Sequence, residues 1–217
     1  MHYICHYRRE RGPEIEEKEG LILDMILTES AKARPNGDKI IIDSVTTNER
    51  TPLMIAAMQG KAHLIRKLLA HSPESISLVD EEGNNAFLLA VSGNHVACVK
   101  MLLDEFSNSI QDSHNNYGWT AFHIGAYYGS YETIKFLLSY QGNSHLFDPN
   151  FKDGTGKKAI DLAVLRGEYE IVTLLGTEPN VEIDQFSASL IAASSLHRFQ
   201  YLNRLRNVLG LSVLQAK

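Results

Sequence analysis

Cysteine is scarce in this sequence: there are two among 217 residues, Cys5 and Cys98, and they lie far apart. Small secreted proteins that rely on disulfides carry more cysteines at regular spacings. No Asn-x-Ser/Thr acceptor for N-glycosylation occurs either. These absences argue against a disulfide scaffold and favour a reducing compartment.

Long apolar runs are also missing. No segment reaches the roughly 18 apolar residues that a membrane-spanning helix needs. The first residues, MHYICHYRRERGPEIEE, lack the apolar core of a signal peptide. We therefore expect a cytoplasmic protein that does not enter a membrane. Secretion into the cytosol of a host cell, without a classical signal peptide, is the alternative.

Positive charge is not in excess, because 21 Lys and Arg stand against 26 Asp and Glu, a formal net charge of −5. Nucleic-acid-binding domains are usually basic, so nucleic acid is not an expected partner. Only residues 187–217 are locally basic, since they hold Arg198, Arg204, Arg206 and Lys217 and no acidic residue. An acidic partner or a membrane surface could meet this charge, but a solvated helix face is the simpler explanation.

Catalytic and cofactor-binding motifs are absent. GTGKK at 154–158 has neither the spacing nor the hydroxyl of a phosphate-binding loop. His2, Cys5 and His6 have spacings that a metal could use, but no second ligand pair accompanies them, so we expect no metal site. Cys98 lies in an apolar block, where a thiol behaves as a small hydrophobic residue. The sequence thus predicts no cofactor and no enzyme activity.

One apolar phrase recurs along the chain. TPLMIAAMQG at 51–60 is followed by NAFLLAVSGN at 85–94 and TAFHIGAYYG at 120–129, and a fourth copy begins at Lys158. The copies start 34, 35 and 38 residues apart. A second apolar block follows each copy: LIRKLL, CVKMLL, TIKFLL and IVTLL. Self-similarity at a period of about 20–50 residues is the signature of stacked repeats.

Each copy is predicted to form two short helices. Small residues at the centre of the phrase, such as Ala56 and Ala57, allow its helix to approach a neighbour closely. The phrase closes with glycine, or with Asn94 in the second unit, and both residue types tolerate the left-handed conformation that ends a helix. The second block repeats apolar residues at spacings of one, three and four, which is one helical face. Neither helix can bury its apolar side alone, so we predict an all-α solenoid of stacked helix-turn-helix units.

These units resemble the ankyrin repeat family. The family signature is a turn beginning Asp-x-x-Gly, then Thr-Pro-Leu-His, a pair of alanines, a glycine and a Leu-Leu pair. TPLMIAA keeps this pattern except for Met54 in the histidine position, and the third unit keeps His123. Asp80 with Gly83, and Asp153 with Gly156, keep the turn. Leu88 and Asp161 replace the histidine in the other two units. The resemblance implies an ankyrin-repeat solenoid with hairpin-like loops, in which His123 forms a structural hydrogen bond between turns.

The four ankyrin repeats are predicted to cover 46–178, with different structures at the two ends. The segment 1–45 contains PEIEEKEGLILDMILTESAKAR, which begins with proline, is acidic early and ends in basic residues, as helices do. We expect an amino-terminal helical cap or degenerate repeat there. The segment 179–217 has an alanine pair and spaced apolar residues, so we expect carboxyl-terminal capping helices or a degenerate repeat.

Binding residues in such a solenoid are expected on its concave face, at the turn tips and on the exposed side of each first helix. The third unit stands out because it places three tyrosines and the only tryptophan there, and these residue types are enriched in interface hot spots. An acidic second unit and a basic fourth unit would give the surface a charge gradient. Packing between turns is the alternative role for the aromatic residues. The predicted partner-binding residues are Asn116, Tyr117, Trp119, Tyr127, Tyr128, Glu81, Glu82, Arg50, Gln59, Lys157 and Arg166.

The sequence therefore predicts a monomeric, non-enzymatic protein–protein interaction module, an adaptor or an inhibitor whose partner is another protein. The alternative is a small effector that recruits or blocks a host protein in a host cytosol. An enzyme with a catalytic terminal segment is the least supported class, because the flanks are too short for a second catalytic domain.

Overall fold

The structure is a computed structural model that describes residues 21, 48–110, 113–140 and 147–194. Within these residues the regular secondary structure is helical, and no strand occurs. The helices are α2 (Pro52–Met58), α3 (Ala62–His71), the 3-10 helix η1 (Pro73–Ser77), α4 (Ala86–Ser92), α5 (Val96–Ile110), α6 (Ala121–Tyr128), α7 (Tyr131–Ser139), α8 (Ala159–Arg166), α9 (Tyr169–Thr177) and α10 (Gln185–Ser194).

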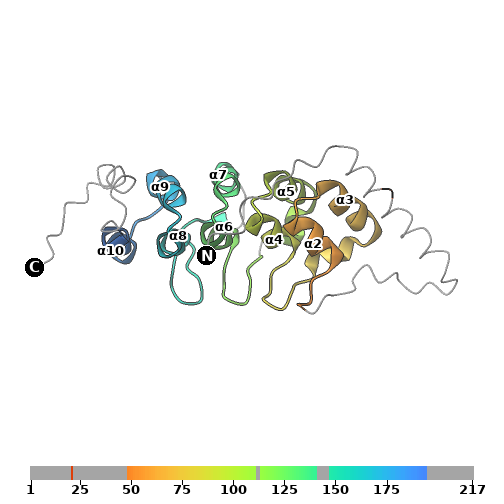
Figure 1. The fold of residues 1–217 in the computed structure, drawn as a ribbon, viewed down its shortest axis with the longest axis horizontal. Helices are drawn as coiled ribbons and strands as arrows, with labels where there is room; N and C mark the ends of the chain where they lie inside the picture. The colour runs from red at the N-terminus through yellow and green to blue at the C-terminus, as the bar shows by residue number, and fades with distance from the viewer. Residues whose placement is uncertain (1–20, 22–47, 111–112, 141–146, 195–217) are drawn as a thin grey trace, which may run out of the picture.

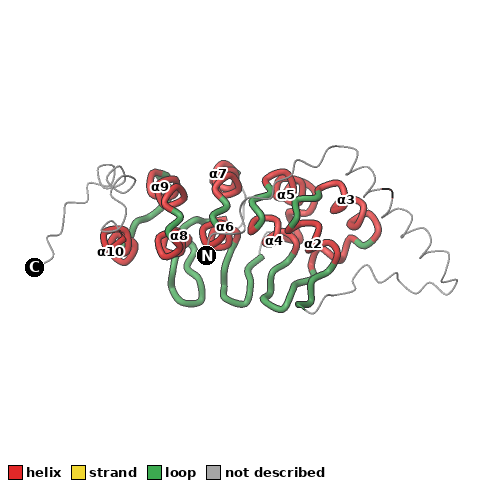
Figure 2. The backbone as a smooth tube through the Cα atoms, in the orientation of Figure 1, coloured by secondary structure: helices red, strands yellow, loops and turns green. Residues whose placement is uncertain are grey.

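Two rows of helices run along the molecule, as Figures 1 and 2 show. The first helices of the units, α2, α4, α6, α8 and α10, form one row, and the loops project from its side. The second helices, α3, α5, α7 and α9, form the other row. Each first helix packs against the next, from α2 to α10. The predicted all-α solenoid of helix-turn-helix units is therefore confirmed.

Small residues lie at the centre of the first helices α2, α4, α6 and α8, where neighbouring helices pack closely. Ala56, Ala90 and Ala163 occupy the same position in their units and are at most 4% exposed. The third unit has Gly125 there, where an added Cβ atom would lie 2.7 Å from Cγ1 of Ile134 in α7. This close approach explains why a small side chain recurs at this point of the repeat.

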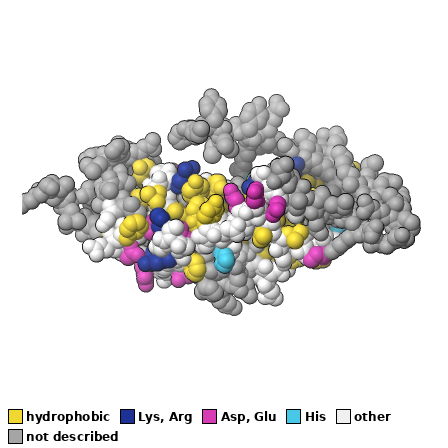
Figure 3. All heavy atoms as spheres, turned by 90° about the horizontal axis from the view of Figure 1, so that it is seen from below, with side chains coloured by type: hydrophobic (Ala, Val, Ile, Leu, Met, Phe, Trp, Pro, Cys, Tyr) yellow, Lys and Arg dark blue, Asp and Glu magenta, His cyan; other side chains and the backbone are white. Residues whose placement is uncertain are grey.

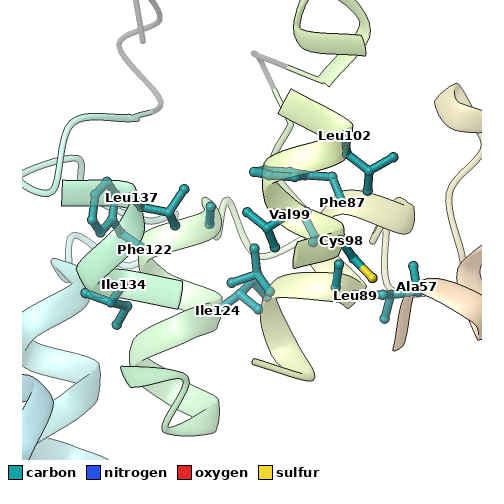
Figure 4. Packing of buried hydrophobic residues seen from close by; sticks show 14 of the residues in the cluster. Ala57, Phe87, Leu89, Cys98, Val99, Leu102, Phe122, Ile124, Ile134 and Leu137 are labelled. Carbon is teal, nitrogen blue, oxygen red and sulfur yellow. The ribbon is translucent and has the colours of Figure 1, made fainter. Parts of the chain in front are cut away.

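The apolar core fills the space between the two rows. Figure 4 shows Phe87 of α4 beside residues of α5, including Cys98, Val99 and Leu102. Cys98 is fully buried, and burial raises the pKa of its thiol to about 11. A thiol with so high a pKa is a poor nucleophile. Cys98 is thus a small apolar core residue, as predicted.

One side chain organises each hairpin-like loop. Asp80, Asn115 and Asp153 hold equivalent positions, and Oδ1 of each accepts hydrogen bonds from the backbone N–H groups two and four residues further on. The N–H···O distances are 2.8–3.1 Å. The predicted turns at Asp80 and Asp153 each contain a glycine with positive φ, Gly83 (82°) and Gly156 (81°).

Neighbouring loops are joined to each other by the backbone. The N–H of Glu81 donates to the carbonyl of Asn48, and the N–H of Asn116 donates to that of Glu82. The equivalent bond between the third and fourth loops runs from Gly154 to Tyr117, at 3.1 Å. The loops therefore form a connected series rather than separate excursions.

The first helices end as predicted, in the left-handed region. Gly60, Gly129 and Gly167 have φ of 75–76°, and Asn94 takes the same place in the second unit with φ of 57°. Asn94 has a further role, because its Oδ1 accepts hydrogen bonds from the N–H and the hydroxyl of Thr133, both at 3.0 Å. The Asn94 side chain thus caps the first turn of α7 in the next unit.

A carbonyl near the end of the first helices α2, α4 and α6 is bound by a side chain of the following unit. His95 Nε2 lies 2.9 Å from the carbonyl oxygen of Met58, and the hydroxyl of Ser130 donates to that of Ser92 at 3.4 Å. In the third unit the acceptor is the Tyr127 carbonyl, which Arg166 Nε reaches at 3.3 Å. The donor side chain and its position differ between units, but the acceptor carbonyl holds the same position in the three units.

His123 forms the hydrogen bond between turns that its position predicts. Its Nε2 lies 3.0 Å from the carbonyl oxygen of Lys157, and its Nδ1 lies 3.3 Å from the N–H of Thr120. Nε2 must therefore donate and Nδ1 must accept, so the ring is neutral. Burial lowers the pKa of His123, and the Lys157 carbonyl and nearby carboxylates oppose this effect without cancelling it.

The two ends are described unequally. The predicted amino-terminal cap, 1–45, lies outside the described residues apart from Leu21. In the predicted carboxyl-terminal segment, 179–217, the structure describes α10, which packs against α8. The buried Lys158 connects them: its Nζ donates to the carbonyl of Glu182 at 2.9 Å and lies 3.5 Å from Oδ2 of Asp184. The domain limits themselves stay predictions.

The cap formed by Asn94 predicts a graded loss of stability. Asn94→Gly keeps the left-handed conformation but removes the bonds to Thr133, which should lower the free energy of unfolding by about 1–2 kcal/mol. Asn94→Ala adds the cost of a Cβ atom at positive φ, for a total loss of about 2–4 kcal/mol. Denaturant unfolding followed by circular dichroism measures both. Equal stabilities of the glycine variant and the wild type would show that the cap contributes nothing.

The neutral His123 predicts a pH dependence. Its pKa is lower in the folded than in the unfolded protein, so the unfolded state binds a proton first as the pH falls below about 6.5. The free energy of unfolding should therefore decrease from pH 7 toward pH 5, and His123→Gln should reduce this slope. Denaturant unfolding at a series of pH values gives both slopes. A variant slope equal to that of the wild type would assign the pH dependence to other groups.

Candidate partner-binding surface

Four aromatic side chains of the third unit form a continuous group, the aromatic cluster: Tyr117, Trp119, Tyr127 and Tyr128. Tyr117 and Trp119 come from the loop before α6, and the two neighbouring tyrosines end α6. The centroid distances are 5.3 Å for Tyr117–Trp119, 4.7 Å for Trp119–Tyr127 and 5.1 Å for Tyr127–Tyr128. These distances and the tilted or edge-to-face orientations are those that aromatic pairs prefer. The structure thus brings together residues that the sequence singled out one by one.

The Trp119 side chain is held in place by a residue of the fourth unit. Its indole Nε1 donates to Oδ2 of Asp153 at 3.0 Å, and its backbone N–H donates to Oδ1 of Asn115 at 3.0 Å. Burial raises the pKa of Asp153, but hydrogen bonds from Lys157, Thr155 and Trp119 outweigh that effect and hold the pKa below its ordinary value. The carboxylate is therefore ionised, which strengthens the bond to the indole.

Tyr127 is fixed from the same side. The Arg166 guanidinium lies 4.4 Å from the centroid of the Tyr127 ring, and its Nε donates to the Tyr127 carbonyl. Cation–π contact and hydrogen bond together bind α8 to the end of α6. Tyr127 and Trp119 are half-buried, so they form the base of the cluster.

The other two rings are accessible. Tyr117 is 55% exposed and Tyr128 is 53% exposed. Both rings lie against the half-buried base, which restricts their motion while leaving one side open. The aromatic cluster is therefore divided into two supporting rings and two accessible rings, a division that the sequence did not reveal.

Charged side chains border the accessible rings. Glu81 and Glu82 are exposed at the tip of the second loop. Tyr128 has a raised pKa, mainly because of burial and next because of the negative charge of Glu82, while Arg50 and Arg166 oppose the shift. Glu82, Arg50 and Arg166 therefore lie within electrostatic reach of the Tyr128 hydroxyl.

The remaining predicted residues are more dispersed. Asn116 is exposed, and its Nδ2 donates to the carbonyl of Glu81 at 3.1 Å. Arg50 forms a salt bridge with Asp80 at 3.1 Å, so much of its charge is neutralised. Lys157 Nζ donates to the Thr155 hydroxyl at 2.7 Å. Gln59 is exposed at the end of α2, one unit further from the cluster than Glu82.

Asp153 is the residue whose second role the sequence analysis missed. It was predicted as a turn residue, but it also accepts the hydrogen bond from Trp119. The equivalent side chains make equivalent contacts, because Asp80 accepts a hydrogen bond from Arg50 and Asn115 donates one to Asn84 in the loop one unit earlier. The side chain at the Asp153 position, in the loop one unit after Trp119, is thus the expected acceptor of the hydrogen bond from the indole.

The described segments offer neither a metal site nor a membrane-spanning helix. No group of three or more His, Cys, Asp and Glu side chains there could hold a metal ion. None of the helices in those segments has both the length and the apolar character needed to cross a membrane. His2, Cys5 and His6, and the basic residues from Arg198 onward, lie outside the described residues.

The stacked helix pairs, joined by loops that are held by side chains, define a repeat solenoid. Comparison with protein families agrees, since the model "Ankyrin repeats (3 copies)" matches residues 22–112, 53–150 and 108–187. This chain belongs to the ankyrin repeat family. Ankyrin repeats are protein-interaction modules, and the described part of this chain consists of such repeats.

Several proteins share the repeat segment. The chain is 29% identical over 131 residues to ankyrin repeat and SAM domain-containing protein 6 of Mus musculus, covering 59% of this chain and 14% of that protein. It is 32% identical over 130 residues to the ankyrin repeat protein FPV031 of fowlpox virus, covering 58% and 36%. It is 26% identical over 130 residues to human transient receptor potential cation channel subfamily A member 1, covering 58% and 11%. The chain thus spans only a minor part of each of these relatives.

The bond between Trp119 and Asp153 predicts a spectroscopic effect. Asp153→Asn keeps an Oδ1 acceptor for the loop, as Asn115 does in the preceding unit, but replaces the charged acceptor of the indole. We expect a loss of about 1–3 kcal/mol in the free energy of unfolding. The emission of Trp119, the only tryptophan, should shift to longer wavelength and become more accessible to acrylamide. Unchanged emission and quenching in a folded variant would contradict the assigned bond.

Proposed function

We propose that this protein is a non-enzymatic interaction module, an adaptor or an inhibitor, that binds another protein through its loop face. The loop face consists of the loops and the adjoining ends of the first helices, and it corresponds to the predicted concave face. The observation that carries the proposal is the pair of exposed rings, Tyr117 and Tyr128, on a fixed aromatic base.

A fixed aromatic surface is suited to binding. Association costs free energy when side chains must be ordered at the interface, and pre-ordered side chains reduce that cost. Trp119 is bound by Asp153, and Tyr127 is bound by Arg166, so the base is already ordered. Tyrosine adds a large apolar area and a hydroxyl that can find a partner at the interface rim.

Packing between loops accounts for only half of the cluster. Trp119 and Tyr127 are half-buried and join the third unit to the fourth, as the structural alternative requires. Tyr117 and Tyr128 leave more than half of their surface exposed, which stability alone does not call for. Exposed aromatic groups of this kind mark interaction sites.

The setting in which the module works is a separate question. Delivery into a host cytosol as an effector was the alternative prediction, and a fowlpox virus protein is among the relatives. Mouse and human proteins are similar to a comparable degree, so the comparisons favour neither setting. The proposed binding mode is the same in both.

The test is loss of a partner on removal of the exposed rings. Tyr117→Ala/Tyr128→Ala should keep the fold and lower the affinity for the partner by roughly 30-fold or more, because a hot-spot ring is worth about 2 kcal/mol or more. Affinity capture from cell extract with quantitative mass spectrometry, followed by titration of the captured protein, measures the effect.

The matched control removes two exposed side chains of the same unit from the other row of helices. Glu132 and Lys135 of α7 are exposed and lie outside the loop face, so Glu132→Ala/Lys135→Ala should retain the partner. Circular dichroism and Trp119 emission verify the fold of both variants. Retention of all partners by the tyrosine variant would refute the proposed site.

A further inference from the structure

The charges around the exposed rings differ in sign on the two sides. Figure 3, which views the loop face, shows hydrophobic side chains near the middle, a group of acidic side chains on one side of them, and basic side chains interspersed with acidic ones on the other. On the acidic side we count Glu81 and Glu82, exposed in the second loop, and on the basic side Lys157 and the exposed Arg166 of the fourth unit. The exposed rings, Tyr117 and Tyr128, lie in the unit between them.

The acidic side is not neutralised within the described structure. Arg50, which like Glu82 acts electrostatically on Tyr128, is paired with Asp80 at 3.1 Å. Glu82 accepts one hydrogen bond from the amide of Asn84, a neutral group, at 3.1 Å. In the segments that the structure describes, neither Glu81 nor Glu82 forms an ion pair.

On the basic side, Lys157 and Arg166 likewise form no ion pair with the described residues. Lys152 and Lys158 of the same unit are both paired with Asp184, whereas the described residues supply no carboxylate for Arg166 or Lys157. Asp153 is buried and accepts hydrogen bonds from its own loop and from Trp119. The guanidinium of Arg166 is instead supported by the Tyr127 ring, a contact that leaves its charge available.

Exposed charges of opposite sign on the two sides of an apolar centre favour a partner whose charges are arranged in the complementary order. We infer that the partner binds with one linear segment that carries basic, apolar and acidic side chains in that spatial order. Its basic end faces Glu81 and Glu82, its apolar centre faces Tyr117 and Tyr128, and its acidic end faces Arg166. This inference rests on the proposed function, and it adds the chemistry of the partner.

Each contact in this arrangement has a physical basis. A basic side chain over Tyr128 can combine a cation–π contact with an ion pair to Glu82, and Arg166 over Tyr127 shows the same kind of contact within the protein. An apolar side chain is desolvated by the tyrosine rings. A carboxylate of the partner can accept a charge-assisted hydrogen bond from Arg166. A segment of the opposite charge order bound in the same position would place like charges together.

The first experiment compares three sets of tryptophan-free peptides with blocked ends. The charged ends are basic and acidic, both basic, or both acidic, and the central positions vary over apolar residues. Trp119 emission reports binding to the full-length protein. We expect the strongest peptide with mixed ends to bind about tenfold more tightly than the strongest of the other two sets at low salt, and the difference to shrink at high salt. Equal affinities, or no binding by any set, would overturn the inference.

The second experiment reverses the charge on the acidic side. Glu81→Lys/Glu82→Lys should weaken the strongest mixed peptide by about tenfold and improve binding of the doubly acidic peptides, because individual exposed ion pairs are weak and act together here. The matched control, Glu132→Lys with Glu170→Lys, makes the same charge change at exposed positions of the second helices α7 and α9. An equal effect of the control would show that net charge, not the position of the charges, determines binding.

The outcomes separate this inference from the proposed function. If Tyr117→Ala/Tyr128→Ala loses its partner but the peptides show no preference for mixed ends, the binding surface stands and the charge order is wrong. If that tyrosine variant keeps its partners, both the surface and the charge order are wrong. A mixed-end preference that is abolished by the tyrosine variant supports both.

Discussion

Contact between neighbouring units is the interaction on which the rest of the structure depends. A unit of two short helices has too little core of its own, so its apolar faces are buried by the units beside it. Small residues such as Ala56 and Ala90 are buried at the centre of the first helices, and Gly125 shows how closely a first helix also approaches the second helix of its own unit. Polar contacts recur as well, because a side chain of the second, third and fourth units binds a carbonyl near the end of the preceding first helix.

The candidate binding surface is a product of the same contacts. The bond from Trp119 to Asp153 and the contact of Arg166 with Tyr127 both cross from the third unit to the fourth. They extend a series in which the loops are already joined by backbone hydrogen bonds. The surface therefore belongs to the junction between units, and any change in the stacking angle would move Tyr117 and Tyr128 relative to the neighbouring charges.

Departures from the family pattern show where sequence reasoning succeeds. Asn94 was predicted to replace a helix-ending glycine, and it does so with positive φ. Its bonds to Thr133 in the next unit were not predicted, because they join positions 39 residues apart. Met54 and Leu88 in the histidine position are simply buried, while Asp161 accepts a hydrogen bond from the N–H of Lys158 in place of the histidine ring. Several residue types can thus satisfy the same position.

The sequence by itself determined the helix pairs, their loops and their ends, because these follow from apolar spacing, turn-forming residues and glycine within some 35 residues of chain. It also identified the unit that holds the aromatic residues. Only the tertiary structure decided that Trp119 and Tyr127 support the cluster, that Tyr117 and Tyr128 are exposed, and that Asp153 holds the indole. These facts depend on distances between side chains of different units, which are set by how closely the units stack and not by the order of residues within one unit.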